Sequence, residues 1–295
     1  MDTIEQIPVI FWHRGESEYL KTALRQAEKY MDKVILIGDK DNRTFSTSWH
    51  DMDLLPSEKW AEFKSEYVNL SLNNAIFELR CFERYFYVRE FCLRKRIDRF
   101  FLIDSDVLLF DNLNLFFQDI RRAFSRTNRK TESWSVSPHC GLWSLKDIIS
   151  FTDYMLEYYK TNVYVLKEKF EKFKQNNTKG GICDMTLLYL WLKESNLPYQ
   201  NTAEILGGGY CIDHAISVAH NAVPDEYKTS IFTGCKKICF ENGKPYLIKR
   251  DDTKVRALAL HCSGGYKNYM YHLVKEKKWT TLTVVRIVKK VSGKM

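Results

Sequence analysis

The sequence predicts an α/β fold in which a mixed β-sheet is flanked by helices. Near the N-terminus, two short apolar runs enclose an amphipathic helical pattern, and the connections are short. This order is typical of neighbouring parallel strands. A third apolar run, at residues 99–103, follows a long helical pattern. The second half carries the hairpin signal Asn242-Gly243, which indicates antiparallel pairing and hence a mixed sheet.

The first half supplies the parallel part of this sheet. Residues 7–12 form an apolar run that predicts a buried strand, and a helix is expected over 16–30 because its apolar residues keep helical spacing. A second buried strand is expected at 34–37. The polar stretch 40–57 predicts a loop, and 67–70 is a candidate third strand.

The middle of the chain leads to a pair of aspartates. Ser71 or Asn73 can cap a long helix over residues 74–95. The apolar run 99–103 then predicts a central strand that ends at Asp104-Ser105-Asp106.

The second half is expected to alternate strands and helices. Residues 167–179 are polar and charged, which predicts a surface excursion or a mobile loop. The other predicted elements are strands at 134–137, 142–144 and 255–260, helices at 147–159 and 184–194, and a hairpin over 237–248.

Composition limits the class of protein. The chain has 295 residues, 45% of them hydrophobic and 28% charged, which excludes a disordered chain, a collagen and a small disulfide scaffold. No apolar run approaches the ~20 residues that span a bilayer, and the first residues lack a signal-peptide pattern, so a cytoplasmic location is expected. The net charge of +8 favours anionic partners, but no nucleic-acid-binding module is recognisable.

The eight cysteines are expected to be reduced, and several lie in apolar contexts. One arrangement leaves two interpretations open. Cys211 and His214, followed by Cys235 and Cys239, have loose zinc-ligand spacing, whereas ordinary core cysteines explain the same residues.

The sharpest chemical feature is the pair Asp104 and Asp106 at the end of a buried strand. Ligands bind at the carboxyl ends of strands in open α/β sheets. Two buried carboxylates repel each other unless a cation lies between them, and a divalent metal supplies that cation. The alternative is a pair of loop aspartates, one of which caps a turn.

A second feature supports the metal site. His261 ends its own predicted strand, and Gly264, Gly265 and Lys267 follow it. A neutral imidazole suits Mn²⁺, glycines allow close approach of an anion, and a lysine supplies a positive charge for phosphate. A core histidine followed by a turn is the alternative.

Together these motifs resemble the GT-A glycosyltransferases, and most closely the branch of glycogenin and the bacterial lipooligosaccharide galactosyltransferases. In that branch an Asp-x-Asp and a C-terminal His-x-x-Gly-x-x-Lys hold Mn²⁺ and the donor diphosphate. The chain also looks like glycosyltransferases of bacterial capsule and O-antigen clusters. The resemblance implies a GT-A (Rossmann-like) domain over 1–278 and a UDP-sugar donor. It also implies a metal, Mn²⁺ or Mg²⁺, held by Asp104, Asp106 and His261.

The resemblance also implies roles for other residues. Asp184, at the start of a predicted helix, is assigned to the reaction centre, although a helix-terminal acid explains it equally well. The implied donor-binding residues are Phe11 or Trp12 for base stacking, Asp39 for ribose or uracil, and Arg80, Ser105, Gly264 and Lys267. His139 and Gly141 are implied to face the acceptor.

The sequence thus predicts a metal-dependent enzyme that moves a hexose from a UDP-sugar to a glycan or glycolipid acceptor in bacterial surface polysaccharide synthesis. The alternative is a haloacid-dehalogenase-like phosphatase with Asp104 as nucleophile. The tail 279–295 is basic and carries Trp279 and β-branched residues among its cations. This composition predicts a peripheral anchor on the inner face of the cell membrane. A final helix packed on the domain is the other interpretation of this tail.

Overall fold

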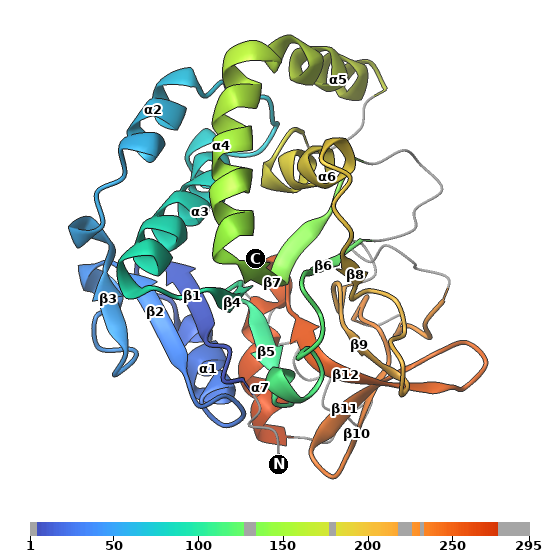
Figure 1. Ribbon diagram of the computed structural model, residues 1–295. Helices are drawn as coiled ribbons and strands as arrows, with labels where there is room; N and C mark the ends of the chain where they lie inside the picture. Colours follow the sequence, from blue (N-terminus) through green and yellow to red (C-terminus); the bar gives the residue numbers. More distant parts are fainter. Residues whose placement is uncertain (1–4, 127–133, 177–180, 218–225, 231–232, 277–295) are drawn as a thin grey trace, which may run out of the picture.

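The structure is a computed structural model that describes residues 5–126, 134–176, 181–217, 226–230 and 233–276. The predicted tail 279–295 lies outside the described residues. Within the described part, the predicted α/β architecture is confirmed: a mixed sheet is flanked by helices, and a second sheet packs beside it (Figure 1).

The main sheet has seven strands in the order β3-β2-β1-β4-β7-β6-β8 within the described residues. The predicted N-terminal strand–helix–strand unit is present, and β1 pairs parallel to both β2 and β4. The strand β7 then runs antiparallel to β4. The bounds are β1 Val9–His13, β2 Val34–Gly38, β3 Trp49–Asp51, β4 Arg99–Ile103, β6 Ala123–Ser125, β7 Ser137–Ser144 and β8 Gln200–Asn201.

The second sheet has the order β10-β11-β12-β5, and β9 also pairs with β12. It contains the predicted hairpin, with Glu241 opposite Lys244 at its turn. The bounds are β5 Val107–Leu109, β9 Tyr210–Ile212, β10 Ile238–Glu241, β11 Lys244–Ile248 and β12 Lys254–His261. Because β4 belongs to one sheet and β5 to the other, residues 104–106 cross between the two sheets.

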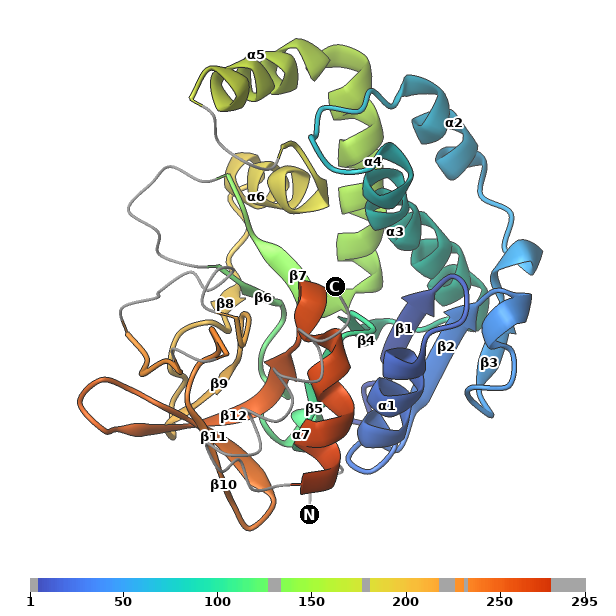
Figure 2. The ribbon, with the colours of Figure 1, turned by 180° about the vertical axis from the view of Figure 1, so that it is seen from behind.

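Helices cover the main sheet on both faces (Figures 1 and 2). The helices α2, α3, α4 and α6 lie on one face, and α1 and α7 lie with the second sheet on the other. The bounds are α1 Glu18–Ala27, α2 Glu58–Glu66, α3 Ala75–Lys95, α4 Leu145–Thr161, α5 Val163–Gln175, α6 Asp184–Glu194 and α7 Met270–Glu276.

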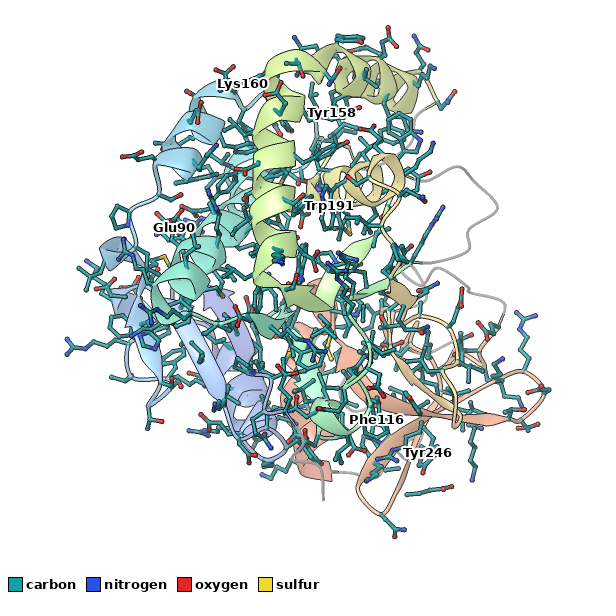
Figure 3. All side chains as sticks on the ribbon, in the orientation of Figure 1. Glu90, Phe116, Tyr158, Lys160, Trp191 and Tyr246 are labelled. Carbon is teal, nitrogen blue, oxygen red and sulfur yellow. The ribbon has the colours of Figure 1, made fainter. Side chains whose placement is uncertain are left out.

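The two faces of the sheet enclose two hydrophobic cores, as the period-2 alternation of strands requires. In β4, Phe101 and Ile103 face the core under α1, whereas Phe100 and Leu102 face the core under α3 and α4. In the latter core lies Trp191 of α6, which Figure 3 labels. It stacks on Trp143 of β7 with a centroid distance of 6.1 Å.

Several predicted elements need correction. Residues 167–179 were expected to form a surface excursion, but the helix α5 occupies 163–175. Its apolar residues Leu166, Phe170 and Phe173 share one face and pack against the core, and the many charges of the segment obscure this pattern.

The strand expected at 67–70 does not form. Residues 67–70 run as an extended connection that contacts Gly181 and Ile182, and Ile182 donates a backbone hydrogen bond to the Leu70 carbonyl at 2.8 Å. The strand β3 lies instead at 49–51, within the stretch expected to be a loop.

The two strands expected around 138–141 are one strand, β7, over 137–144. Pro138 lies near its start, outside the residues that pair with β4, so its missing N–H breaks no bond of that ladder.

Candidate active site

Asp104 and Asp106 lie in the short crossing between β4 and β5. The Asp104 N–H donates to the His139 carbonyl of β7 at 2.8 Å, and the Val107 N–H donates to the Asp104 carbonyl at 3.0 Å. Val107 pairs with His261 of β12. The crossing between the sheets therefore brings the end of β12 to the aspartates, although 155 residues separate His261 from Asp106.

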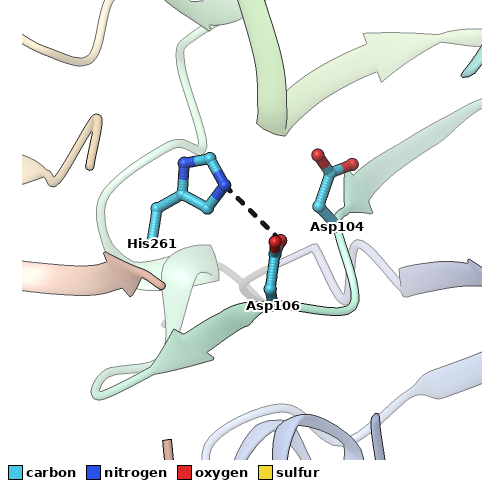
Figure 4. A group of neighbouring side chains, drawn as sticks. All are labelled: Asp104, Asp106 and His261. Atoms are coloured by element: carbon cyan, nitrogen blue, oxygen red, sulfur yellow. Dashed lines mark ion pairs between the residues drawn. The ribbon is translucent and has the colours of Figure 1, made fainter. Parts of the chain in front are cut away.

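Asp104, Asp106 and His261 gather into one cluster (Figure 4). Each offers a ligand atom, and these atoms lie within 4.8 Å of one another. The His261 Nε2 is 3.4 Å from Asp106 Oδ1. In the part of the chain that the structure describes, no other group of three or more histidine, cysteine or acidic residues is arranged to hold a metal. Cys211, His214, Cys235 and Cys239, which were weighed as a zinc site, do not form such a group.

The donor set fits a divalent metal. The His261 Nδ1 is 2.6 Å from the carbonyl oxygen of His214, and a carbonyl can only accept, so Nδ1 carries the proton. The lone pair of neutral His261 is therefore on Nε2, which faces the carboxylates. Two carboxylates and one imidazole suit Mn²⁺, and a backbone carbonyl behind the imidazole is the usual way its orientation is fixed.

Charges around Asp106 keep this carboxylate ionised. Burial alone would raise the pKa of Asp106, but His261 and Lys267 hold the pKa at about 2. The Lys267 Nζ lies 3.3 Å from Asp106 Oδ2. Burial opposes the charge on His261, yet Asp106 raises its pKa to about 9, so a metal ion would bind only with loss of the proton from Nε2. The site thus concentrates cations around a carboxylate pair, as expected where a cation and a phosphate bind together.

Arg84 of α3 connects the metal cluster to α6. Its Nη1 bonds to Asp104 Oδ1, and its Nη2 donates to Asp184 Oδ2 at 2.5 Å. The Tyr85 hydroxyl donates to the same Asp184 oxygen at 2.8 Å. Burial disfavours the charge of Arg84, but Asp104, with further help from Asp184, raises its pKa above its usual value. One guanidinium therefore fixes the spacing between two carboxylates from different elements.

A cleft of about 280 Å³ opens in front of the aspartates. Trp12 and His13 at the end of β1 line it, with Arg80 of α3 and Lys267. His13 lies between two hydroxyls, with Nδ1 3.1 Å from Ser105 Oγ and Nε2 3.2 Å from Ser17 Oγ. Burial, and next Lys267, lower the pKa of His13 to about 4, so this side chain is neutral at pH 7.

The predicted donor-binding residues form two groups, those that line the cleft and those that do not. Trp12, Arg80, Ser105 and Lys267 line the cleft. Phe11, the alternative to Trp12 for base stacking, is fully buried in the core and does not reach it. The Asp39 carboxylate accepts from Gly15 N at 2.7 Å and Asp41 N at 3.2 Å, so it holds the loop after β1.

Three other predicted residues lie around the site. Gly264 begins a 3-10 helix over Gly264–Tyr269 with a φ of +62°, a conformation that favours glycine. His139 and Gly141, expected to face the acceptor, lie within β7 and are buried. Among the described residues, neither is part of the cleft lining. The His139 ring instead stacks on His261 from behind, at a centroid distance of 4.4 Å.

Arg84 does not pair with its chain neighbour Glu83, which forms a two-point ion pair with Arg14, at 2.8 and 2.9 Å. Arg14, Tyr19 and Phe77 also line the cleft and were not predicted. Their signal in the sequence was position alone: Arg14 follows β1 directly, and Tyr19 and Phe77 lie in the first turns of α1 and α3.

No protein-family model matches the sequence, and no curated protein matches it. Solved structures are similar in fold. Mouse xyloside xylosyltransferase 1, in its apo form, is 11% identical with a TM-score of 0.45, over 66% of this chain and 84% of its own.

The galactosyltransferase LgtC, in complex with donor and acceptor sugar analogues, is 13% identical with a TM-score of 0.34, over 63% of this chain and 70% of its own. A glycosyltransferase involved in glycosylation of the major capsid of PBCV-1 is 11% identical with a TM-score of 0.38, over 90% and 98%. These similarities concern the fold, so the function proposed below rests on the geometry of the site.

Among the described residues, no helix is both long and apolar enough to cross a bilayer.

Proposed function

We propose that the protein is a metal-dependent glycosyltransferase that moves a hexose from a UDP-sugar to a glycan acceptor. The observation that carries this proposal is the cluster of Asp104, Asp106 and His261, with Lys267 3.3 Å from Asp106, at the edge of a cleft. A nucleoside diphosphate needs a divalent cation and further positive charge, and both can be supplied here.

Each side chain has a defined task in this proposal. Asp104, Asp106 and His261 would hold Mn²⁺ or Mg²⁺, which would neutralise charge on the leaving diphosphate. Lys267 contacts the same diphosphate as a point charge. Trp12 supplies an aromatic face for the uracil, and Arg80 lies on the cleft wall where it can reach the donor.

Asp184 is proposed to act at the transferred sugar. Its carboxylate is 5% exposed, and Arg84 ties it to Asp104. This link sets the distance from the metal cluster to the start of α6, so a donor bound at the metal would present its sugar to a fixed carboxylate.

The acceptor is proposed to be a lipid-linked glycan of bacterial surface polysaccharide, approached from the inner face of the cell membrane. The basic segment 279–295 would bring the enzyme to anionic lipid. The division into a catalytic domain, 1–278, and this tail is part of the proposal.

The phosphatase alternative is not favoured. Its nucleophile, Asp104, has one carboxylate oxygen bound to Arg84, which lowers the nucleophilicity of that oxygen. Val107-Leu108 also follow the motif, where such phosphatases commonly have Gly-Thr.

Thermal unfolding with UDP and Mn²⁺ tests the proposal. Ligand at 100 times its Kd stabilises a protein by about 2.7 kcal/mol, which corresponds to a rise in Tm of roughly 5 °C. EDTA and the variant Asp106→Asn should each abolish this rise and the transfer of hexose. Asp111→Asn is the matched control, since Asp111 is also buried and ion-paired but does not line the cleft. Equal protection of wild type and Asp106→Asn would refute the metal assignment.

A further inference from the structure

The segment Asp213–His214 holds two stacked imidazoles behind the metal cluster. The Asp213 carbonyl is 3.1 Å from His139 Nε2, and the His214 carbonyl is 2.6 Å from His261 Nδ1. Carbonyl oxygens only accept, so both nitrogens are donors. The rings of His139 and His261 lie at 9° to each other. The His214 carbonyl thus orients the His261 ring directly, and the Asp213 carbonyl orients the His139 ring that stacks on it.

This segment is itself held by a buried ion pair. The Asp213 carboxylate is 0% exposed, and its Oδ1 is 2.5 Å from Nζ of Lys236, which is 3% exposed. The other carboxylate oxygen lies 3.4 Å from the His261 backbone N–H. The Asp213 carboxylate therefore contacts the backbone of His261, the proposed metal ligand. Asp213 is also the chain neighbour of His214, whose carbonyl orients the His261 ring.

The backbone completes the attachment. Asp213 N–H donates to the Ala259 carbonyl at 3.0 Å, and Ile216 N–H donates to the His261 carbonyl at 3.0 Å. Lys236 N–H donates to the Ile216 carbonyl at 2.8 Å. Lys236 also lies over the Tyr227 ring, 4.8 Å from its centroid. Lys236 is thus fixed by its own backbone while its ammonium reaches Asp213.

Stability alone does not account for such a pair. Burying two charges costs desolvation energy, and apolar residues of similar volume often stabilise a protein equally well. Substitution of the residues that hold a metal-binding imidazole, in contrast, typically weakens metal binding by 10- to 100-fold. We propose that Asp213 and Lys236 are positioning residues that hold the His214 carbonyl, and through it the His261 ring, in place for the metal. This inference rests on the proposed function, because it takes His261 as a ligand.

The test is a titration of the metal-free protein with Mn²⁺, followed by electron paramagnetic resonance without substrate. Lys236→Met should weaken Mn²⁺ binding at least about tenfold. Arg122→Met is the matched control. It breaks a second strongly buried pair, Arg122–Asp147, in which both side chains are 4% exposed and the atoms 2.6 Å apart. The control should lower the Tm in a similar way while Mn²⁺ affinity stays within about twofold of wild type.

A second variant covers the case in which Lys236→Met does not fold. Asp213→Asn with Lys236→Gln replaces two buried charges by a neutral amide pair, which removes the desolvation cost. Neutral hydrogen bonds are about 1 kcal/mol weaker than charged ones, so about fivefold weaker Mn²⁺ binding is expected.

The outcomes separate this inference from the proposed function. Wild-type Mn²⁺ affinity in a folded Lys236→Met or in the double variant overturns the positioning role and leaves the glycosyltransferase proposal intact. An equal loss of affinity in Arg122→Met also overturns it, because the effect is then one of general stability. A wild-type protein that binds no Mn²⁺ overturns both.

Discussion

Arg84 is the residue on which the geometry of the site depends most directly. Its planar guanidinium has separate N–H groups for Asp104 and Asp184, and this matches its use where two acceptors must be kept at a fixed spacing. Asp104 follows β4 and Asp184 begins α6, so the two aspartates lie far apart in the sequence. Arg84 therefore joins a proposed metal ligand to a proposed reaction-centre carboxylate.

Replacing Arg84 by lysine should break the link between Asp104 and Asp184. A lysine has one charged nitrogen and cannot reach both carboxylates, so Asp184 should move away from Asp104. Misplacement by about 1 Å can cost roughly 10²-fold in rate. We expect kcat of Arg84→Lys to fall by about that factor. Steady-state kinetics with a UDP-sugar measures it, with Arg122→Lys, another buried ion-paired arginine, as the control. An unchanged kcat would show that the bridge is not needed.

Asp184 itself should affect turnover and not donor affinity. Asn at position 184 keeps the shape and can still accept from Arg84 and Tyr85, but it removes the charge. We expect Asp184→Asn to lower kcat by roughly 10³-fold and to leave the Kd for UDP nearly unchanged. Calorimetry with UDP and Mn²⁺ gives the Kd. Loss of UDP binding would move Asp184 away from the sugar, and a wild-type kcat would make it a helix-terminal residue only.

At the scale of elements, the start of α6 is fixed by contact with the connection before α3. Gly181 pairs with Ser71, and the Ile182 N–H donates to the Leu70 carbonyl at 2.8 Å. Ser71 in turn donates to Glu78 of α3 at 2.9 Å. These contacts place α6, and with it Asp184, against the helix that carries Arg84.

Gly181→Ala should disturb this placement. A Cβ at position 181 would lie 2.3 Å from the Ser71 Cα and 2.6 Å from the Leu70 carbonyl oxygen, both backbone atoms, so the chains must separate. Overpacking of this kind costs about 1–3 kcal/mol. We expect a lower Tm and a lower kcat. Gly207→Ala, where an added Cβ meets no atom within 4 Å, is the control and should change neither. Wild-type kcat in Gly181→Ala would mean that α6 can shift without effect on turnover.

Elements with a local signal could be predicted from the sequence, and those that depend on tertiary contacts could not. Helix α6 begins and ends at the predicted residues 184 and 194, and the strand β4 matches 99–103. The helix α5 was missed because its charges outnumber the four apolar residues that pack against the core. The Arg84–Asp184 bond spans 100 residues, and the position of Asp213 behind His261 follows from the pairing of β9 with β12, so neither has a local pattern.

At the scale of the whole molecule, the site lies where the two sheets meet. The main sheet delivers Asp104 at the end of β4, the second sheet delivers His261 at the end of β12, and helices α3 and α6 add Arg84 and Asp184. One core packs both sheets against α1 and α7, the other packs the main sheet against α2, α3, α4 and α6, and the crossing at 104–106 joins the two sheets. Destabilising either core is therefore expected to affect the site, which is why matched controls elsewhere in the molecule are needed.

The tail 279–295 is predicted to bring the whole protein to its proposed acceptor. Residues 279–295 carry four cations, no acidic residue and an interfacial tryptophan, Trp279. Each cation near an anionic leaflet contributes about 1 kcal/mol, and salt screens this attraction. Truncation after Lys278 should release the protein from anionic vesicles and spare transfer to a short soluble acceptor. Sedimentation with vesicles at low and high salt measures binding. Full binding by the truncated protein would place the anchor elsewhere, and loss of folding would make the segment part of the domain.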